Sequence, residues 1–272
     1  MIYFLDFRGR NVGGPVLPGR LIGLPGVASG MEDDLRRETR IIFLVHGFNV
    51  NRQNGQTALR QLAGMLTRST ESALVAVTWP GDSWAKAAGY PLEGNDADDT
   101  ARELVRFADR VVQDGAQLSF VSHSMGGRVV METIKRLPPG RFAVSQACVM
   151  AAAVDDFSLA WGKAYLGAVQ NSGRVTVLAS QSDKVLRFAY PAGDFLQSFL
   201  FFWKDVAGKA LGLRGPRAKN GVAVPVNVHH EQIPDGAKVD HGDYISGNPG
   251  PKHVAAGKFA DAALAGEPKP VY

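Results

Sequence analysis

The sequence predicts an α/β protein with a mostly parallel central sheet flanked by helices, and three observations support this fold class. Short apolar runs, many of them β-branched, alternate along the chain with amphipathic helical patterns. Most of these runs are almost continuously apolar, which is typical of strands covered by helices on both faces. The composition is 45% hydrophobic and 21% charged over 272 residues, which is sufficient for a large core. We therefore expect a single domain over residues 1–272.

Six segments are predicted to be strands because they are short, apolar and bounded by polar or Gly-containing stretches. They are residues 40–48, 73–80, 117–124, 146–154, 174–180 and 224–230. The Gly- and Pro-rich residues 8–26 are predicted to form a loop.

Three helical patterns lie between the predicted strands. Residues 55–70 repeat leucines on one side of a helix. Residues 96–115 begin with carboxylates, which suit a helix N-terminus, and stop at Gly115. Residues 126–140 end at two prolines, which cannot continue a helix. This order of strands and helices predicts a parallel sheet with right-handed crossovers.

Charge and cysteine content exclude several function classes. Lys and Arg number 30 against 26 Asp and Glu, and the charges are mixed, so we expect no nucleic-acid binding. No apolar run is long enough to span a bilayer, so we expect no stable membrane insertion. The single cysteine, Cys148, can form no internal disulfide, which fits a reducing compartment. Asp6 and Arg8 interrupt the apolar N-terminus where a signal peptide would need a continuous run. We therefore expect a cytoplasmic protein.

The motif "FVSHSMGGRVV" places Ser124 where a buried strand ends and an amphipathic helix begins. A serine on such a sharp turn projects its hydroxyl above the sheet, and the first helical amides face a developing negative charge. Gly126 and Gly127 let the turn and the following helix pack closely. Ser122 stands where the usual G-x-S-x-G pattern has its first glycine. The motif predicts that Ser124 is a catalytic nucleophile.

A second motif, "FLVHGFNVNRQNG", follows an earlier predicted strand. Gly47 allows the backbone N–H of Phe48 to turn inward as an oxyanion donor, with the N–H of Met125 as its partner. We expect His46 to order this loop and to take no part in proton transfer.

These segments together resemble the α/β-hydrolase superfamily. The stretches "LVHGFN", "TWPGD", "SHSMGGRVV" and "SDKVL" are similar to a bacterial group of uncharacterised, esterase- and lipase-like serine hydrolases, over residues 40–241. The resemblance implies hydrolysis of esters or related acyl bonds, with no metal and no organic cofactor. It also implies the chain order nucleophile, acid, histidine.

The order implied by the resemblance guides the choice of acid and base. Asp183 follows the strand before the last, where such enzymes carry the acid, and we favour it over Asp155 and Asp156. His241 lies in a polar loop after the last strand, from which it can reach over the sheet edge, and we favour it over His230. The alternative role of Asp183 is that of a turn or helix-capping aspartate.

Two aromatic-rich insertions are candidates for the substrate pocket, near residues 82–97 and 190–215. The second contains Phe195 and Phe199, which we expect to contact substrate, although a helix buried against the sheet remains the alternative.

Trp79 and His123 are further candidates for the pocket wall, and packing inside the protein is the alternative for His123. Aromatic walls favour apolar acyl groups, so the sequence predicts a carboxylesterase acting on small to medium acyl esters. The alternatives are a thioesterase or acyltransferase with the same triad, and a hydrolase-fold protein that binds a ligand or partner without turning it over.

Overall fold

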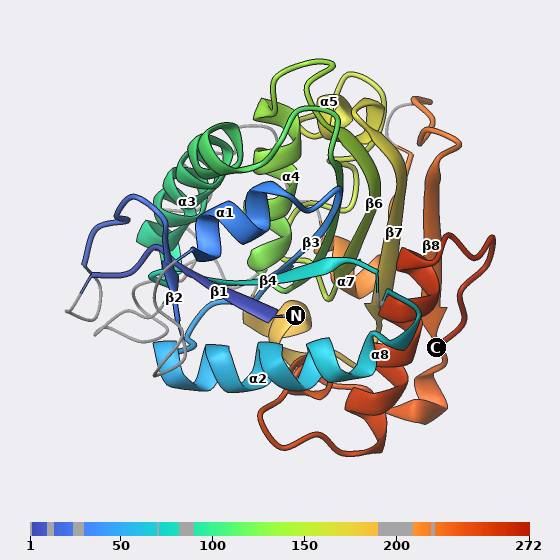
Figure 1. Ribbon diagram of the computed structural model, residues 1–272. Coiled ribbons are helices and arrows are strands. Elements are labelled where there is room, and N and C mark those ends of the chain that lie inside the picture. The colour runs from blue at the N-terminus through green and yellow to red at the C-terminus, as the bar shows by residue number, and fades with distance from the viewer. Residues whose placement is uncertain are drawn as a thin grey trace.

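The centre of the protein, in the residues that the structure describes, is an eight-stranded sheet with the strand order β2-β1-β4-β3-β5-β6-β7-β8 (Figure 1). A computed structural model describes residues 2–9, 14–23, 30–69, 71–81, 90–189, 209–218 and 221–272. Within these ranges neighbouring strands are parallel, except that β2 runs antiparallel to β1. The strands are β1 Ile2–Asp6, β2 Arg20–Ile22, β3 Arg40–Val45, β4 Ala73–Thr78, β5 Gln117–His123, β6 Ala143–Met150, β7 Ser172–Ser180 and β8 Val228–Ile233. The predicted fold class is confirmed.

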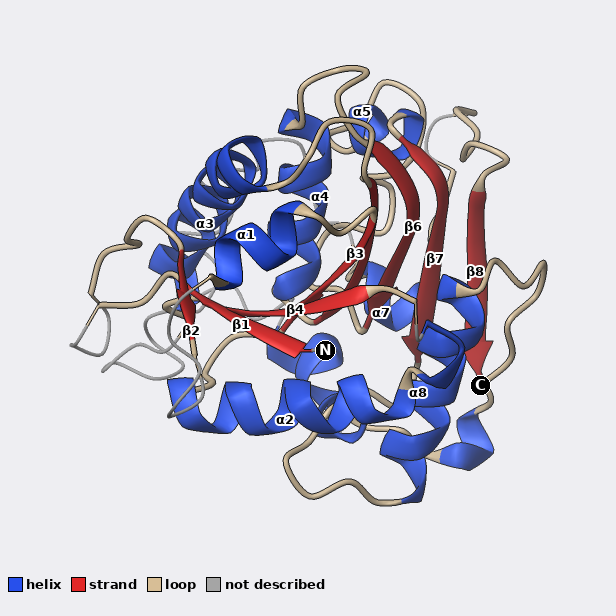
Figure 2. Cartoon of the chain, in the orientation of Figure 1, coloured by secondary structure: helices blue, strands red, loops and turns tan. Residues whose placement is uncertain are grey.

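Helices cover both faces of this sheet (Figure 2). α1, α3, α4 and α5 pack against one another in one layer, whereas α2 packs with α8 in the other. The α-helices are α1 Met31–Arg36, α2 Arg52–Met65, α3 Tyr90–Val111, α4 Gly126–Arg136, α5 Leu166–Gln170, α7 Leu211–Arg214 and α8 Pro251–Leu264. The shorter helical turns are η1 Thr67–Ser69, η3 Val185–Ala189, η4 Asp235–Ala237 and η5 His241–Asp243.

The central strands are apolar on both faces because each face lies under helices. Phe43 in the middle of β3 pairs with Val75 of β4 and with Phe120 of β5. The rings of Phe43 and Phe120 stack with their centroids 5.3 Å apart, and all three side chains are buried. This core fixes β3 and β5 side by side, so the loops that follow both strands emerge at the same edge of the sheet.

The N-terminal region differs from the prediction. β1 was not predicted, and β2 lies within residues 8–26, which were expected to be loop. β2 has only three residues and depends on pairing with β1, for example Phe4 with Ile22. β1 in turn pairs with β4, a partner far along the chain. Such strands are formed by long-range pairing, and a local sequence pattern carries little of that information.

The last strand begins four residues later than predicted. Pro225 has no backbone N–H to donate to a ladder, and its carbonyl accepts the amide of Val228 at 3.1 Å in a turn. β8 pairs only with β7 in the described part of the sheet, so an exposed edge tolerates the polar residues His229 to Gln232.

The described ends of both predicted insertions, 82–97 and 190–215, belong to the body of the fold. Tyr90 begins α3, so the last residues of the first insertion are helical. In the second, α7 is buried, and the amide of Leu211 donates to the carbonyl of Val154 at 2.7 Å. The remaining residues of both insertions lie outside the described ranges, so a lid there stays a prediction.

In the part of the chain that the structure describes, no helix is both long and apolar enough to cross a bilayer.

Candidate active site

Ser124 sits on a sharp turn between β5 and α4. Its φ is 56°, in the left-handed region that L-residues seldom occupy outside functional turns. Three backbone hydrogen bonds hold it there. Its amide donates to the Met150 carbonyl at 3.0 Å, and its carbonyl accepts the amides of Gly127 at 3.0 Å and Ala153 at 3.2 Å. The turn is thus anchored to the end of β6 and to the first turn of α4.

The turn has room only for small residues where it meets the neighbouring strand. A Cβ on Gly126 would lie 2.5 Å from the carbonyl oxygen of His46, a distance that real Cβ atoms do not show. Ser122, which occupies the first small-residue position of the motif, is 1% exposed. The structure therefore accommodates a serine at the position where the usual motif has glycine.

Three side chains form a continuous hydrogen-bonded chain at this turn. His241 Nε2 lies 2.9 Å from Ser124 Oγ, and His241 Nδ1 lies 2.8 Å from Asp183 Oδ2. Because a carboxylate accepts and cannot donate, Nδ1 carries the proton and Nε2 presents its lone pair to the hydroxyl. This is the tautomer that a general base needs. The structure thus brings together the three residues predicted as nucleophile, acid and base.

Asp183 uses its two carboxylate oxygens differently. Oδ2 faces His241, whereas Oδ1 accepts the amide of Leu186 at 2.8 Å, at the start of η3. The side chain is fully buried. Both roles considered for this residue are therefore present at once: the capping bond orients the carboxylate, and the other oxygen is left for the imidazole.

The two alternative acids, Asp155 and Asp156, lie on the segment that follows β6. The backbone of Asp155 forms an isolated bridge with Ala210. The backbone of Asp156 donates to Lys209 at 2.8 Å and accepts from Arg217 at 2.7 Å. Both aspartates thus follow β6 and fasten the segment around α7 to it.

His230, the alternative base, lies within β8 and is not in a loop. It pairs in register with Val177, three residues before the end of β7, and its side chain is half-buried. The imidazole that hydrogen-bonds to Ser124 is that of His241.

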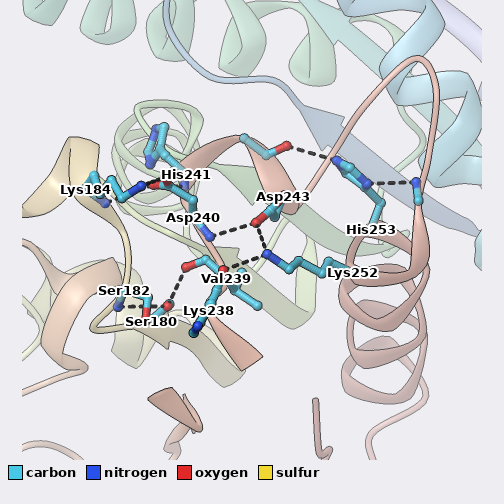
Figure 3. A network of polar contacts seen from close by, with 12 residues as sticks. Ser180, Ser182, Lys184, Lys238, Val239, Asp240, His241, Asp243, Lys252 and His253 are labelled. Carbon is cyan, nitrogen blue, oxygen red and sulfur yellow. Dashed lines mark hydrogen bonds and ion pairs between the residues drawn. The ribbon is translucent and has the colours of Figure 1, made fainter. Parts of the chain in front are cut away.

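The loop that carries His241 is fastened to β7 and the start of η3 (Figure 3). Asp240 Oδ1 accepts two backbone amides, from His241 at 2.8 Å and from Lys184 at 2.9 Å. Ser180 Oγ donates to the carbonyl of Val239 at 2.7 Å. Burial raises the pKa of Asp240, but the hydrogen bonds from Lys184 and His241 outweigh this and lower it below its ordinary value. The carboxylate therefore stays ionised and holds the loop.

The same loop is also fastened to α8 (Figure 3). Lys252 Nζ lies 2.8 Å from Asp243 Oδ2 and donates to the carbonyl of Lys238 at 2.6 Å. His253 Nε2–H donates to the carbonyl of Gly242 at 2.9 Å. None of these anchors is predicted by the sequence. Asp240 and Asp243, which form a capping box around η5, carried the one local signal that could have revealed them.

His123 was predicted to line the substrate pocket, but it contacts the protein itself. Its side chain is 8% exposed, and Nε2 lies 2.9 Å from the backbone carbonyl oxygen of His241. Burial lowers its pKa well below the ordinary value, and the neighbouring His241 lowers it further. His123 is therefore neutral near pH 7.

Trp79, also predicted to line the pocket, is completely buried behind the loop that follows β3. Its ring stacks on that of His46 with the centroids 5.8 Å apart, and its Nε1–H donates to the His46 carbonyl at 2.9 Å. His46 Nδ1–H donates in turn to the carbonyl of Gly47 at 2.7 Å. Burial lowers the pKa of His46 to about 4. Both residues thus support the loop from inside the core.

The predicted oxyanion donors belong to two backbone segments beside Ser124. Met125 immediately precedes α4, so its amide lies at the positive end of an 11-residue helix. Phe48 follows Gly47, where a Cβ would lie 2.8 Å from the Cβ of Ser124. The loop after β3 therefore passes directly against the nucleophile.

Other predicted features find no test in the structure. Phe195 and Phe199 lie outside the described residues. Among the residues that are described, no group of three or more His, Cys, Asp or Glu side chains could hold a metal ion.

Comparison with known families gives one match. The family described as "Alpha/beta hydrolase of unknown function (DUF900)" matches residues 28–195, more than half of the chain. The matched span includes Ser124 and Asp183 and ends before His241. No curated protein matches this sequence.

Several solved structures are similar to this chain at low sequence identity. Esterase PE8 is 12% identical with a TM-score of 0.44, covering 84% of this chain and 92% of its own. The poly(3-hydroxybutyrate) depolymerase LpqC from Bordetella parapertussis is 15% identical with a TM-score of 0.47, covering 86% of this chain and 82% of its own. The lin2722 product from Listeria innocua is 10% identical with a TM-score of 0.43, covering 86% of this chain and 97% of its own.

Proposed function

Because the chain belongs to the DUF900 family of alpha/beta hydrolases, we propose that it is a serine hydrolase that cleaves carboxylic esters through an acyl-enzyme intermediate. The observation that carries this proposal is the hydrogen-bonded series Ser124–His241–Asp183, with contacts of 2.9 and 2.8 Å. The required imidazole tautomer is fixed by the buried carboxylate, before any substrate is bound.

In the acylation half, His241 Nε2 removes the proton of Ser124 as Oγ attacks the carbonyl carbon of the ester. The carbonyl π electrons move to oxygen, and the amides of Met125 and Phe48 stabilise the resulting oxyanion. The intermediate collapses when the C–O bond to the alcohol breaks and the imidazolium returns its proton to the leaving oxygen. Asp183 stabilises the imidazolium throughout and is not itself protonated.

In the deacylation half, water replaces the alcohol. His241 takes one proton from water as the oxygen attacks the acyl carbon, and then returns that proton to Ser124 Oγ as the acyl bond breaks. The products are a carboxylic acid and the free enzyme. We propose acyl groups of small to medium size, because the sequence around 190–208 is rich in aromatic and leucine side chains.

Covalent labelling by a fluorophosphonate tests the proposal without knowledge of the natural substrate. A serine activated by a base displaces the fluoride and becomes phosphonylated. We expect one label per chain on the wild type, on the peptide containing Ser124, and no labelling of Ser124→Ala or of unfolded protein. A folded wild-type protein that takes up no label would instead favour a non-catalytic hydrolase-fold binding protein.

A panel of substrates then distinguishes the acyl chemistries. We expect turnover of p-nitrophenyl esters that is lost in Ser124→Ala while the circular dichroism stays unchanged. Comparing oxygen esters, thioesters and amides of one acyl group separates an esterase from a thioesterase. Adding an alcohol acceptor shows whether the acyl group passes to water or is transferred.

A further inference from the structure

His123 makes a direct contact with the backbone of the proposed base. It is the residue before Ser124 and the last residue of β5, yet its ring reaches a segment 118 residues further along the chain. Its Nε2 lies 2.9 Å from the carbonyl oxygen of His241. The residue next to the nucleophile thus holds the residue that must deprotonate it.

The chemistry of the two groups determines which of them donates the hydrogen bond. A carbonyl oxygen can only accept a hydrogen bond, so Nε2 of His123 carries the proton and donates. The rings of His123 and His241 lie 4.8 Å apart at an angle of 45°, and the ring of Tyr244 lies 5.6 Å from that of His123. The His123 ring is therefore enclosed between protein groups, which restricts it to one orientation.

The backbone of His241 is consequently held at both of its polar groups. Its amide donates to Asp240 Oδ1 at 2.8 Å, and its carbonyl accepts from His123 at 2.9 Å. With the backbone fixed, little freedom remains for the imidazole to leave the line between Asp183 and Ser124. A displacement of about 1 Å in a reacting group can lower a rate by about 100-fold, so this restraint has consequences for chemistry.

We propose that His123 is a positioning residue, whose Nε2–H fixes the carbonyl of His241 and thereby keeps the imidazole in register with the Ser124 hydroxyl. This inference rests on the proposed function, and it replaces the expectation that His123 lines the substrate pocket. His123 takes no proton in the reaction and touches no reacting atom.

The neutral charge of the His123 ring supports its role as a positioning residue for His241. His241 becomes an imidazolium during the reaction, and a second positive charge beside it would oppose that change. Burial lowers the pKa of His123 well below its ordinary value, so the ring stays neutral while it donates.

Two substitutions separate the hydrogen bond from the volume of the ring. His123→Gln keeps an N–H donor that can reach the same carbonyl, whereas His123→Leu fills similar space without any donor. His229→Leu is the matched control, because it makes the same change at a partly buried histidine in β8. The first readout is the rate constant of fluorophosphonate labelling. The others are kcat and KM of the unlabelled enzyme on a p-nitrophenyl ester, with kcat divided by the number of active sites that labelling of a parallel sample counts.

We expect His123→Leu to lower kcat and the labelling rate constant by about 10- to 100-fold with KM little changed. His123→Gln should recover most of the loss, and His229→Leu should match the wild type. Counting labelled sites removes any contribution from misfolded protein, so a merely structural role would leave kcat per site unchanged.

Three results would overturn the inference. One is a labelling rate constant in His123→Leu equal to that of the wild type. Another is a raised KM with unchanged kcat, which would make His123 a substrate contact. The third is a His123→Gln variant as slow as His123→Leu. The proposed function fails by a different result, namely a wild-type protein that takes up no label at all.

Discussion

Asp240 accepts the backbone amide of Lys184 at 2.9 Å, although 56 residues separate the two along the chain. Lys184 follows Asp183, and Asp240 precedes His241, so one carboxylate joins the segment of the proposed acid to that of the proposed base. The same oxygen also accepts the amide of His241. The relative position of acid and base thus depends on a residue outside the triad.

Replacing Asp240 should therefore weaken both the loop and the reaction. Asp240→Ala removes the acceptor of both amides and the cap of η5, a loss that typically costs about 1 kcal/mol of stability. We expect a lower melting temperature and slower fluorophosphonate labelling per folded molecule, with partial recovery in Asp240→Asn. The matched control is Asp235→Ala, an exposed aspartate on η4. Labelling of Asp240→Ala at the wild-type rate would show that the tether has no role in the reaction.

A second prediction concerns the assignment of the acid. Asp183→Asn retains an oxygen for the Leu186 amide but no longer fixes the proton on His241 Nδ1. In the best-studied serine protease triad the equivalent change lowers kcat by about 10⁴. We expect a loss of about 10³- to 10⁴-fold here, measured on a p-nitrophenyl ester, with little change in circular dichroism.

The alternative acids provide the controls for that experiment. Asp155→Asn and Asp156→Asn should keep the wild-type order of magnitude in kcat, because both residues belong to the segment that holds α7. If either of them lost activity while Asp183→Asn kept it, the acid would have been assigned to the wrong strand end.

Ser124 and Asp183 could be placed from the sequence because each lies close to the end of a strand with a strong local signal, whereas His241 lies in the loop beyond β8 and η4. β5 and β7 are nearly continuous apolar runs, so their ends, and with them Ser124 and Asp183, are well defined. Parallel strands bring such ends to one edge of a sheet. The resemblance to a known superfamily supplied the order of the three residues.

The supporting contacts could not be read in the same way. The partners of His123 and Asp240 lie 118 and 56 residues away in the sequence, and no local pattern reports on them. His123 was accordingly expected to face substrate. Trp79 was likewise read as part of an aromatic wall, yet its indole donates a hydrogen bond to the carbonyl of His46 inside the core. Whether such a side chain faces substrate or the protein interior depends on its burial, and burial follows from tertiary packing.

A third prediction uses the close approach of the loop after β3. At Gly47 a Cβ would lie 2.8 Å from the Cβ of Ser124 and 3.1 Å from Nδ1 of His123. Gly47→Ala should displace the Phe48 amide from the nucleophile, and the loss of one oxyanion donor lowers turnover by about 10²- to 10³-fold. The measurement is kcat on a p-nitrophenyl ester.

The control is the same substitution where space is available. A Cβ on Gly64, on the exposed side of α2, would meet no atom within 4 Å. Gly64→Ala should leave kcat unchanged and stabilise the protein by roughly 0.5–1 kcal/mol, because alanine loses less conformational freedom in a helix. Equal kcat values for the two variants would place the Phe48 amide outside the oxyanion site.

The last prediction concerns acid stability. His46 is buried and neutral, its pKa is lowered to about 4, mainly by burial and further by Arg8, and an unfolded histidine titrates near 6.5. Between these values the unfolded chain binds a proton that the folded chain does not, so the free energy of unfolding falls as the pH falls from 6.5 toward 4. For His46 alone the loss between pH 7 and pH 5 is about 2 kcal/mol.

His46→Asn should remove the share of this dependence that His46 contributes, about 2 kcal/mol between pH 7 and pH 5, because asparagine can still donate to the Gly47 carbonyl but does not titrate. Urea unfolding followed by circular dichroism at pH 7, 6 and 5 measures the effect. The matched control is His229→Asn, since His229 is only partly buried and should leave most of the acid sensitivity in place. The buried His123, whose pKa is also lowered, accounts for part of the slope that remains. Parallel curves for the wild type and His46→Asn would mean that His46 is already protonated in the folded protein, or that acid unfolding begins at another group.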